Sequence, residues 1–157
     1  MNAEICYRVG DVTAPSGEGN KIIAHICNDR GKWGKGFVLA LSRRWLQPAE
    51  AFKAWFKEAN GFELGAVQFV QVEPDVWVAN MVGQHGLKAQ KGVPPIRYEA
   101  LSTCLEEVAS KAKELGATVH MPRIGCGLAG GEWSKVEPII LEALCEKGIE
   151  VTVYDLA

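Results

Sequence analysis

No hydrophobic run in this 157-residue chain is long enough to span a membrane, and its N-terminal residues show no basic segment followed by an apolar one. We therefore expect a cytoplasmic protein with no membrane partner. The chain also lacks a strong charge of either sign, because its formal net charge is −2. This balance argues against general nucleic-acid binding, although it leaves room for a local basic patch.

Paired cysteines and metal-ligand clusters are missing as well. The five cysteines are odd in number and include no C-x-x-C pair, so we expect reduced thiols, mostly in the core. His25 and Cys27 share one face of a strand, but no second ligand pair is spaced for zinc. No Gly-Lys pair is followed by Ser or Thr, which excludes a Walker A loop. We expect neither a metal nor another cofactor.

Glycine-rich turns are what the chain does have. The apolar run from Val119 opens into Gly125, Gly127, Gly130 and Gly131 before a helical pattern starts at Glu132. Glycines allow the backbone to approach a ligand closely, and a following helix directs unpaired N–H groups at the turn. The pattern predicts a phosphate site; the alternative is a tight strand-to-helix turn without a ligand.

Hydrophobic periodicity predicts one α/β domain over residues 1–157, with the order β-β-α-α-β-β-α-β-α-β. The six strands would form a mixed sheet between two helical layers. A second glycine-rich loop, residues 28–36, follows the buried strand expected at 21–27. Both glycine-rich loops leave the carboxyl ends of strands, where ligands of such sheets bind, so we expect them to face one ligand with several phosphates.

The spacing of Gly125, Gly127 and Gly130 also matches the dinucleotide-binding fingerprint between a strand and a helix. A Rossmann domain needs several further β-α units after that fingerprint, and only one helix and one strand are expected here. Redox chemistry with a dinucleotide is therefore the least favoured of the functions considered.

Three motifs in this order resemble the macrodomain, the ADP-ribose-binding module. They are Gly10-Asp11-Val12-Thr13, the run Ile23 to Asn28 that leads to Gly34-Lys35-Gly36-Phe37, and the run Met121 to Leu128. The resemblance spans essentially the whole chain and implies a three-layer α/β/α fold with a mixed sheet of about six strands. The most similar branch contains the yeast ADP-ribose-1″-phosphate phosphatase, the terminal ADP-ribose protein glycohydrolase and the antitoxins that remove ADP-ribose from DNA.

The resemblance also implies roles for single residues. Asp11, next to Val12, would accept a hydrogen bond from the adenine amino group, and the alternative is an aspartate that only caps its turn. Asn28 would bind the distal ribose. The diphosphate would lie between two sets of residues: Gly34, Lys35, Gly36 and Phe37 on one side, and Ile124, Gly125, Cys126, Gly127, Leu128, Ala129 and Gly130 on the other.

The catalytic residue is harder to assign. The lysine and aspartate of the glycohydrolase branch correspond to Gln84 and Ala129, which cannot do that chemistry. His25 matches a histidine of the yeast phosphatase, so it is predicted to act as an acid or base; the alternative is a buried, hydrogen-bonded histidine. His85, in the long loop after Val82, is the second catalytic candidate.

Two functions therefore stand ahead of redox chemistry. The first is a hydrolase of ADP-ribose derivatives, acting on ADP-ribose-1″-phosphate or on ADP-ribosylated protein or nucleic acid. The second is a module that binds ADP-ribose without turning it over, which the missing lysine and aspartate favour. In both cases we expect a monomer whose partner is ADP-ribose or an ADP-ribosylated substrate.

Overall fold

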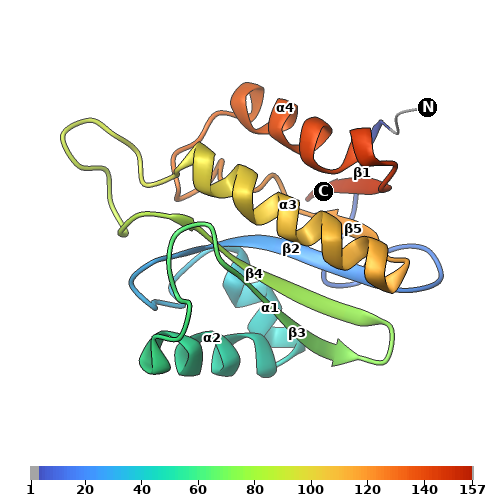
Figure 1. Cartoon of the computed structure of the whole chain (residues 1–157), viewed down its shortest axis with the longest axis horizontal. Helices are drawn as coiled ribbons and strands as arrows, with labels where there is room; N and C mark the ends of the chain where they lie inside the picture. The colour runs from blue at the N-terminus through green and yellow to red at the C-terminus, as the bar shows by residue number, and fades with distance from the viewer. Residues whose placement is uncertain (1–3, 157) are drawn as a thin grey trace.

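The strands and helices of the computed structural model follow the order predicted from the sequence (Figure 1). The structure describes residues 4–156. The elements within them are β1 (Ile5–Val9), β2 (Lys21–Asn28), α1 (Phe37–Arg44), α2 (Gln47–Glu58), β3 (Val67–Glu73), β4 (Val76–Gln84), α3 (Tyr98–Leu115), β5 (Thr118–Met121), α4 (Trp133–Ala143), the short 3-10 helix η1 (Cys145–Lys147) and β6 (Val151–Asp155). The predicted elements are all present, and only their ends differ, as is usual for element boundaries.

The strands form one six-stranded sheet in the order β1-β6-β5-β2-β4-β3. Neighbouring strands are parallel except for β3 and β4, which form the antiparallel hairpin that their short connection predicts. The central strand β2 is buried along its length apart from the partly exposed Ile26. Its continuous apolar pattern is explained by helices that cover both faces of the sheet.

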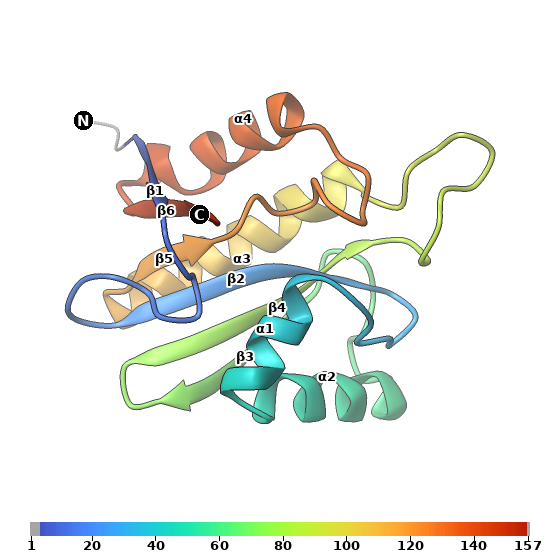
Figure 2. The ribbon, with the colours of Figure 1, turned by 180° about the vertical axis from the view of Figure 1, so that it is seen from behind.

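Helices α3 and α4 cover one face of the sheet, and α1 and α2 cover the other (Figures 1 and 2). On the first face Leu105 and Ile140 pack in a core cluster with residues of β2, β4 and β5. On the second face Leu41 packs with Ile23 and Val78. The three-layer α/β/α fold expected from the sequence is thus confirmed.

Local signals set the ends of two helices. Pro48 lies in the first turn of α2, where a backbone N–H would have no acceptor within the helix, so proline costs no hydrogen bond there. Gly116 ends α3 with φ 63°, a left-handed conformation that glycine adopts without strain. The buried face of α3 begins at Leu101 and recurs with helical spacing, which fixes this helix against the sheet beside the long loop.

The five parallel strands place their carboxyl ends at one edge of the sheet, where the loops after β1, β2, β4 and β5 begin (Figure 2). The long loop after β4 is tied to its neighbours by backbone hydrogen bonds. His85 N–H donates to the Pro95 carbonyl (2.8 Å), and Ile96 N–H donates to the Ala129 carbonyl (3.0 Å). Residues far apart in the sequence therefore meet at this edge.

Candidate functional site

Two glycine-rich loops lie at the carboxyl edge, and each leads into a helix. Gly36 is the N-cap of α1 and Glu132 is the N-cap of α4, and neither side chain caps its helix. The N–H groups at the first two positions of each helix have no hydrogen-bond partner among the described residues, so they are available to an acceptor, and both helix dipoles favour an anion there. A Cβ placed on Gly36 would lie 3.6 Å from Leu128 Cδ1, so the two loops approach each other closely.

The glycines of the 124–131 loop have different surroundings. Gly125 has φ 74°, and a Cβ there would lie 2.4 Å from Ile96 Cδ1. A Cβ on Gly131 would lie 2.5 Å from the Gly125 carbonyl oxygen. Around Gly127, in contrast, no heavy atom lies within 4 Å of the Cβ position, and its φ is not in the left-handed region. The fold requires glycine at 125 and 131, whereas Gly127 borders open space.

The other predicted members of this loop face in different directions. Ile124 and Ala129 are buried, whereas Leu128 is 65% exposed at the loop tip. Cys126 is half-buried, and its thiol donates to the Ile124 carbonyl (3.5 Å). Burial raises the pKa of Cys126, so its sulfur is a neutral thiol and a poor nucleophile near pH 7.

Asn28 organises the first glycine-rich loop from within. Its side-chain oxygen accepts hydrogen bonds from the N–H groups of Arg30 (2.9 Å) and Lys32 (3.1 Å). Its amide nitrogen donates to the Lys32 carbonyl (2.8 Å). The second N–H of the Asn28 side-chain amide can therefore donate to a ligand. Gly34 and Lys35 further along the loop are exposed, and Phe37 is partly buried.

Asp11 sits in the turn after β1. Its Oδ1 accepts hydrogen bonds from the Thr13 hydroxyl (2.7 Å) and the Thr13 N–H (2.9 Å). These bonds hold the pKa of Asp11 below its usual value. Val12 is buried in the core beneath the turn. Asp11 therefore caps its turn, and the remaining carboxylate oxygen can still accept a hydrogen bond from a ligand.

His25 lies inside the fold with 1% exposure, and its Nε2 is 2.5 Å from Asn80 Oδ1. The Asn80 amide donates to the Pro48 carbonyl (3.2 Å) and to Gln68 Oε1 (3.0 Å), so its oxygen must face His25. Nε2 is then the protonated nitrogen, and the buried Nδ1 has no partner among the described residues. Burial lowers the pKa of His25 to about 4. These contacts favour the interpretation of His25 as a buried, hydrogen-bonded histidine.

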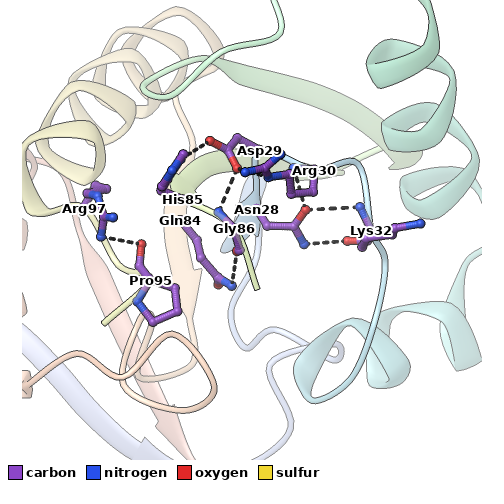
Figure 3. Close-up of polar contacts among 9 residues, drawn as sticks. All are labelled: Asn28, Asp29, Arg30, Lys32, Gln84, His85, Gly86, Pro95 and Arg97. Atoms are coloured by element: carbon purple, nitrogen blue, oxygen red, sulfur yellow. Dashed lines mark hydrogen bonds and ion pairs between the residues drawn. The ribbon is translucent and has the colours of Figure 1, made fainter. Parts of the chain in front are cut away.

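His85 forms a pair that sequence reasoning missed (Figure 3). Its Nδ1 is 2.6 Å from Asp29 Oδ2, and the side chains of His85 and Asp29 are 37% and 17% exposed. Burial alone would raise the pKa of Asp29, but hydrogen bonds from Gly86 N–H and His85 lower it. The sequence showed only that Asp29 directly follows Asn28 at the carboxyl end of β2, and it did not show that His85 lies beside it.

Gln84 and Ala129 offer no acid or base to the site. Gln84 donates from Nε2 to the Gly86 carbonyl (3.0 Å), and Ala129 is 6% exposed. In the part of the chain that the structure describes, no group of three His, Cys, Asp or Glu side chains could hold a metal ion. The same residues include no helix that is long and apolar enough to cross a membrane. His85 and Asp29 are a titratable pair at the carboxyl ends of β2 and β4.

Comparison with known proteins matches residues 24–140 to the Macro domain family model. A chromodomain-helicase-DNA-binding protein 1-like of Danio rerio is 33% identical over 96% of this chain and 15% of its own length. The ADP-ribose glycohydrolase OARD1 of Bos taurus is 43% identical over 60 residues, 38% of this chain and 40% of that protein. An ADP-ribose 1″-phosphate phosphatase of Lodderomyces elongisporus is 24% identical over 95% of this chain and 98% of its own length. The chain spans less than a fifth of the chromodomain-helicase relatives it matches.

Solved structures also match the macro domain fold of this chain. A macrodomain protein from Streptomyces coelicolor is 63% identical with a TM-score of 0.86, over 97% of this chain and 99% of that one. A protein of unknown function from Bacteroides thetaiotaomicron is 61% identical with a TM-score of 0.96, over 98% of both chains. Thermosipho africanus DarTG in complex with ADP-ribose shares the fold at 21% identity and a TM-score of 0.70, over 87% of this chain and 38% of that one.

Proposed function

Because the chain belongs to the macro domain family, we propose that it binds ADP-ribose along the carboxyl edge of its sheet and hydrolyses derivatives linked at C1″ of the distal ribose. The observation that carries this proposal is the pair of glycine-rich loops beside the Asp29–His85 pair. Relatives named as a glycohydrolase and a phosphatase of ADP-ribose derivatives support it.

The ligand would extend along the carboxyl edge of the sheet from Asp11 at its adenine end to His85 at its distal ribose. Adenine would meet the free carboxylate oxygen of Asp11, which can accept from the exocyclic amine. The diphosphate would occupy the space next to Gly127, between the first turns of α1 and α4. The distal ribose would then reach the remaining N–H of Asn28 and the imidazole of His85.

We propose His85 as the catalytic residue and a structural role for His25. A general base must reach the proton that it removes, and His85 is partly exposed at the carboxyl edge. His25 is buried, and its one hydrogen-bonding nitrogen is occupied by Asn80. The missing glycohydrolase lysine does not exclude hydrolysis, because a base that activates water needs no covalent adduct.

Basic residues concentrate around this edge. Segments 30–36 and 86–97 contain six basic residues and no acidic one, although the whole chain carries a net charge of −2. These loops flank the proposed position of the distal ribose. A local positive field raises the concentration of anionic ligands, so it supports a substrate that bears phosphate groups beyond the ribose. Both ADP-ribose-1″-phosphate and an ADP-ribosylated nucleic acid meet this description.

Calorimetry and product analysis test the proposal. ADP-ribose should bind much more tightly than AMP, since AMP lacks the second phosphate and the distal ribose; equal affinities would refute the site. Turnover should then be measured on ADP-ribose-1″-phosphate, an ADP-ribosylated protein and an ADP-ribosylated oligonucleotide. Tight ADP-ribose binding without turnover of any of the three would favour the alternative, a module that only reads ADP-ribose.

We further propose that the protein acts as a monomer in the cytoplasm. All five of its cysteines are free, which suits a reducing compartment. Sedimentation at micromolar concentration would test the monomer, and a dimer that persists on dilution would contradict it.

A further inference from the structure

Asp29 is held in place from several sides at the carboxyl ends of β2 and β4 (Figure 3). Its Oδ1 accepts from Gly86 N–H at 2.8 Å, and its Oδ2 is the partner of His85 Nδ1. Its own N–H donates to the Gln84 carbonyl at 2.9 Å. The Arg30 guanidinium lies 3.8 Å from Oδ1. The carboxylate therefore has a fixed orientation relative to the imidazole.

This arrangement determines which nitrogen of His85 carries the proton. An ionised carboxylate has no hydrogen to donate, so the contact with Asp29 requires a proton on Nδ1. The neutral imidazole then carries a lone pair on Nε2. Nε2 has no hydrogen-bond partner among residues 4–156 and is not among their buried unpaired atoms, so it is open to solvent.

We propose that Asp29 is a positioning residue, which holds His85 in the tautomer whose free Nε2 faces the distal ribose of the bound ligand. The inference rests on the proposed function for its catalytic consequence, but its statement about the tautomer stands without it. Carboxylate–imidazole pairs of this kind keep a general base in the correct orientation in other enzymes. Asp29 itself touches neither the substrate nor the attacking water.

The pair supports a balanced hydrolysis. Water attacks the electrophilic centre at the 1″ position, either the ribose carbon or the phosphorus of its phosphate, while Nε2 of His85 takes the water proton. The bond to the leaving oxygen breaks, and its electron pair stays with that oxygen. The imidazolium, stabilised by Asp29, returns the proton to the leaving group. One water is consumed, and both side chains regain their starting states.

Nitrogen-15 NMR of the free protein tests the tautomer directly. In the neutral ring of the wild type, the His85 signals, assigned by their loss in His85→Gln, should show a protonated Nδ1 and an unprotonated Nε2. A proton on Nε2 instead of Nδ1 in the neutral wild-type ring would overturn the proposal. This measurement does not depend on turnover.

Asp29→Asn provides the second test. Gly86 N–H contacts Oδ1 of Asp29 and His85 Nδ1 contacts Oδ2, and an amide keeps an oxygen at only one of these two positions. If that oxygen stays with Gly86, the amide N–H₂ faces Nδ1 of His85, and the ring proton must then lie on Nε2. We expect the Nε2–H tautomer to dominate in this variant. Asp75→Asn, which lies in the hairpin turn and contacts Lys21, is the matched control and should leave His85 unchanged. An unchanged tautomer in a folded Asp29→Asn protein would also overturn the proposal.

Kinetics connect the tautomer to the proposed function. On a substrate that the wild type hydrolyses, Asp29→Asn should lower kcat at least roughly tenfold with little change in KM, because general-base catalysis contributes roughly 10²–10⁴-fold. Adding Asp29→Asn to His85→Gln should cost nothing further, since Asp29 acts through His85. A further loss in the double variant would show a role for Asp29 that does not pass through His85. If the wild type turns over nothing, the hydrolase proposal fails, and the NMR result still decides the position of the proton.

Discussion

Two buried histidines should make the stability of this protein fall steeply in mild acid. His25 is enclosed by β2, β4 and aromatic residues, and its Nε2 donates to Asn80. His120 is 2% exposed, between Thr118 Oγ1 (2.7 Å) and the Tyr154 hydroxyl (2.8 Å). Burial is the largest cause that lowers the pKa of each histidine to about 4, from 6.5 in the unfolded chain.

The sign and size of the effect follow from linkage. Both folded-state pKa values lie below the unfolded value, so the unfolded chain binds more protons between about pH 6.5 and pH 4. Stability is fully present above that range and is lost as the pH falls through it. From pH 7.5 to pH 5 each histidine should cost about 2 kcal/mol of unfolding free energy, or about 4 kcal/mol together. Carboxylates contribute mainly at lower pH, so they leave this window largely free.

Urea unfolding followed by circular dichroism at pH 7.5 and pH 5 measures the loss. His25→Gln and His120→Gln should each remove about 2 kcal/mol of the pH-dependent loss, and the double variant should remove both contributions. If the single variants at 25 and 120 kept the wild-type pH dependence, the buried neutral histidines would not be its cause.

Three further predictions concern the site. Gly127→Val should abolish ADP-ribose binding in calorimetry without lowering the melting temperature. Gly125→Val, in contrast, should lower the melting temperature, because its Cβ would meet the side chain of Ile96. Retained affinity in a folded Gly127→Val protein would show that this loop does not hold the diphosphate. His85→Gln should reduce turnover by roughly 10²–10⁴-fold and spare ADP-ribose affinity, while His25→Gln keeps turnover at pH 7; the reverse pattern would return catalysis to His25. Asp11→Ala should weaken ADP-ribose binding roughly tenfold and hardly affect the hypoxanthine analogue, which lacks the amino group; equal losses would contradict the adenine contact.

The fold could be predicted from the sequence because its signals are local. The continuous apolar run of β2 predicts a strand buried on both faces, and Gly116 predicts the end of α3. The short connection between β3 and β4 requires an antiparallel hairpin. The strand order could not be predicted from local patterns, because β1 pairs with β6 and these strands lie at opposite ends of the sequence. Such pairing depends on packing that no local pattern records.

The sequence predicted that the two glycine-rich loops lie together at the carboxyl edge, but it did not predict the contact between Asp29 and His85. The resemblance to the yeast phosphatase directed attention to His25, but it carries no information on which face of β2 a residue occupies once helices cover both faces. In the structure His25 faces the aromatic residues Trp33 and Phe37. Asp29 and His85 lie 56 positions apart and meet only because β2 and β4 are neighbours with parallel ends. A pair of this kind becomes visible when the sheet order is known.

The glycines of the 124–131 loop show the same limit in one short segment. The sequence pattern treats them as equivalent, but Gly125 is required by Ile96 from the neighbouring loop, and Gly131 is required by the carbonyl of Gly125. Gly127 has an ordinary φ and open space at its Cβ position, so neither its backbone nor its neighbours need a glycine there. A side chain at 127 would enter this open space. If the diphosphate lies there as we propose, substitution of Gly127 should weaken ligand binding and leave folding intact.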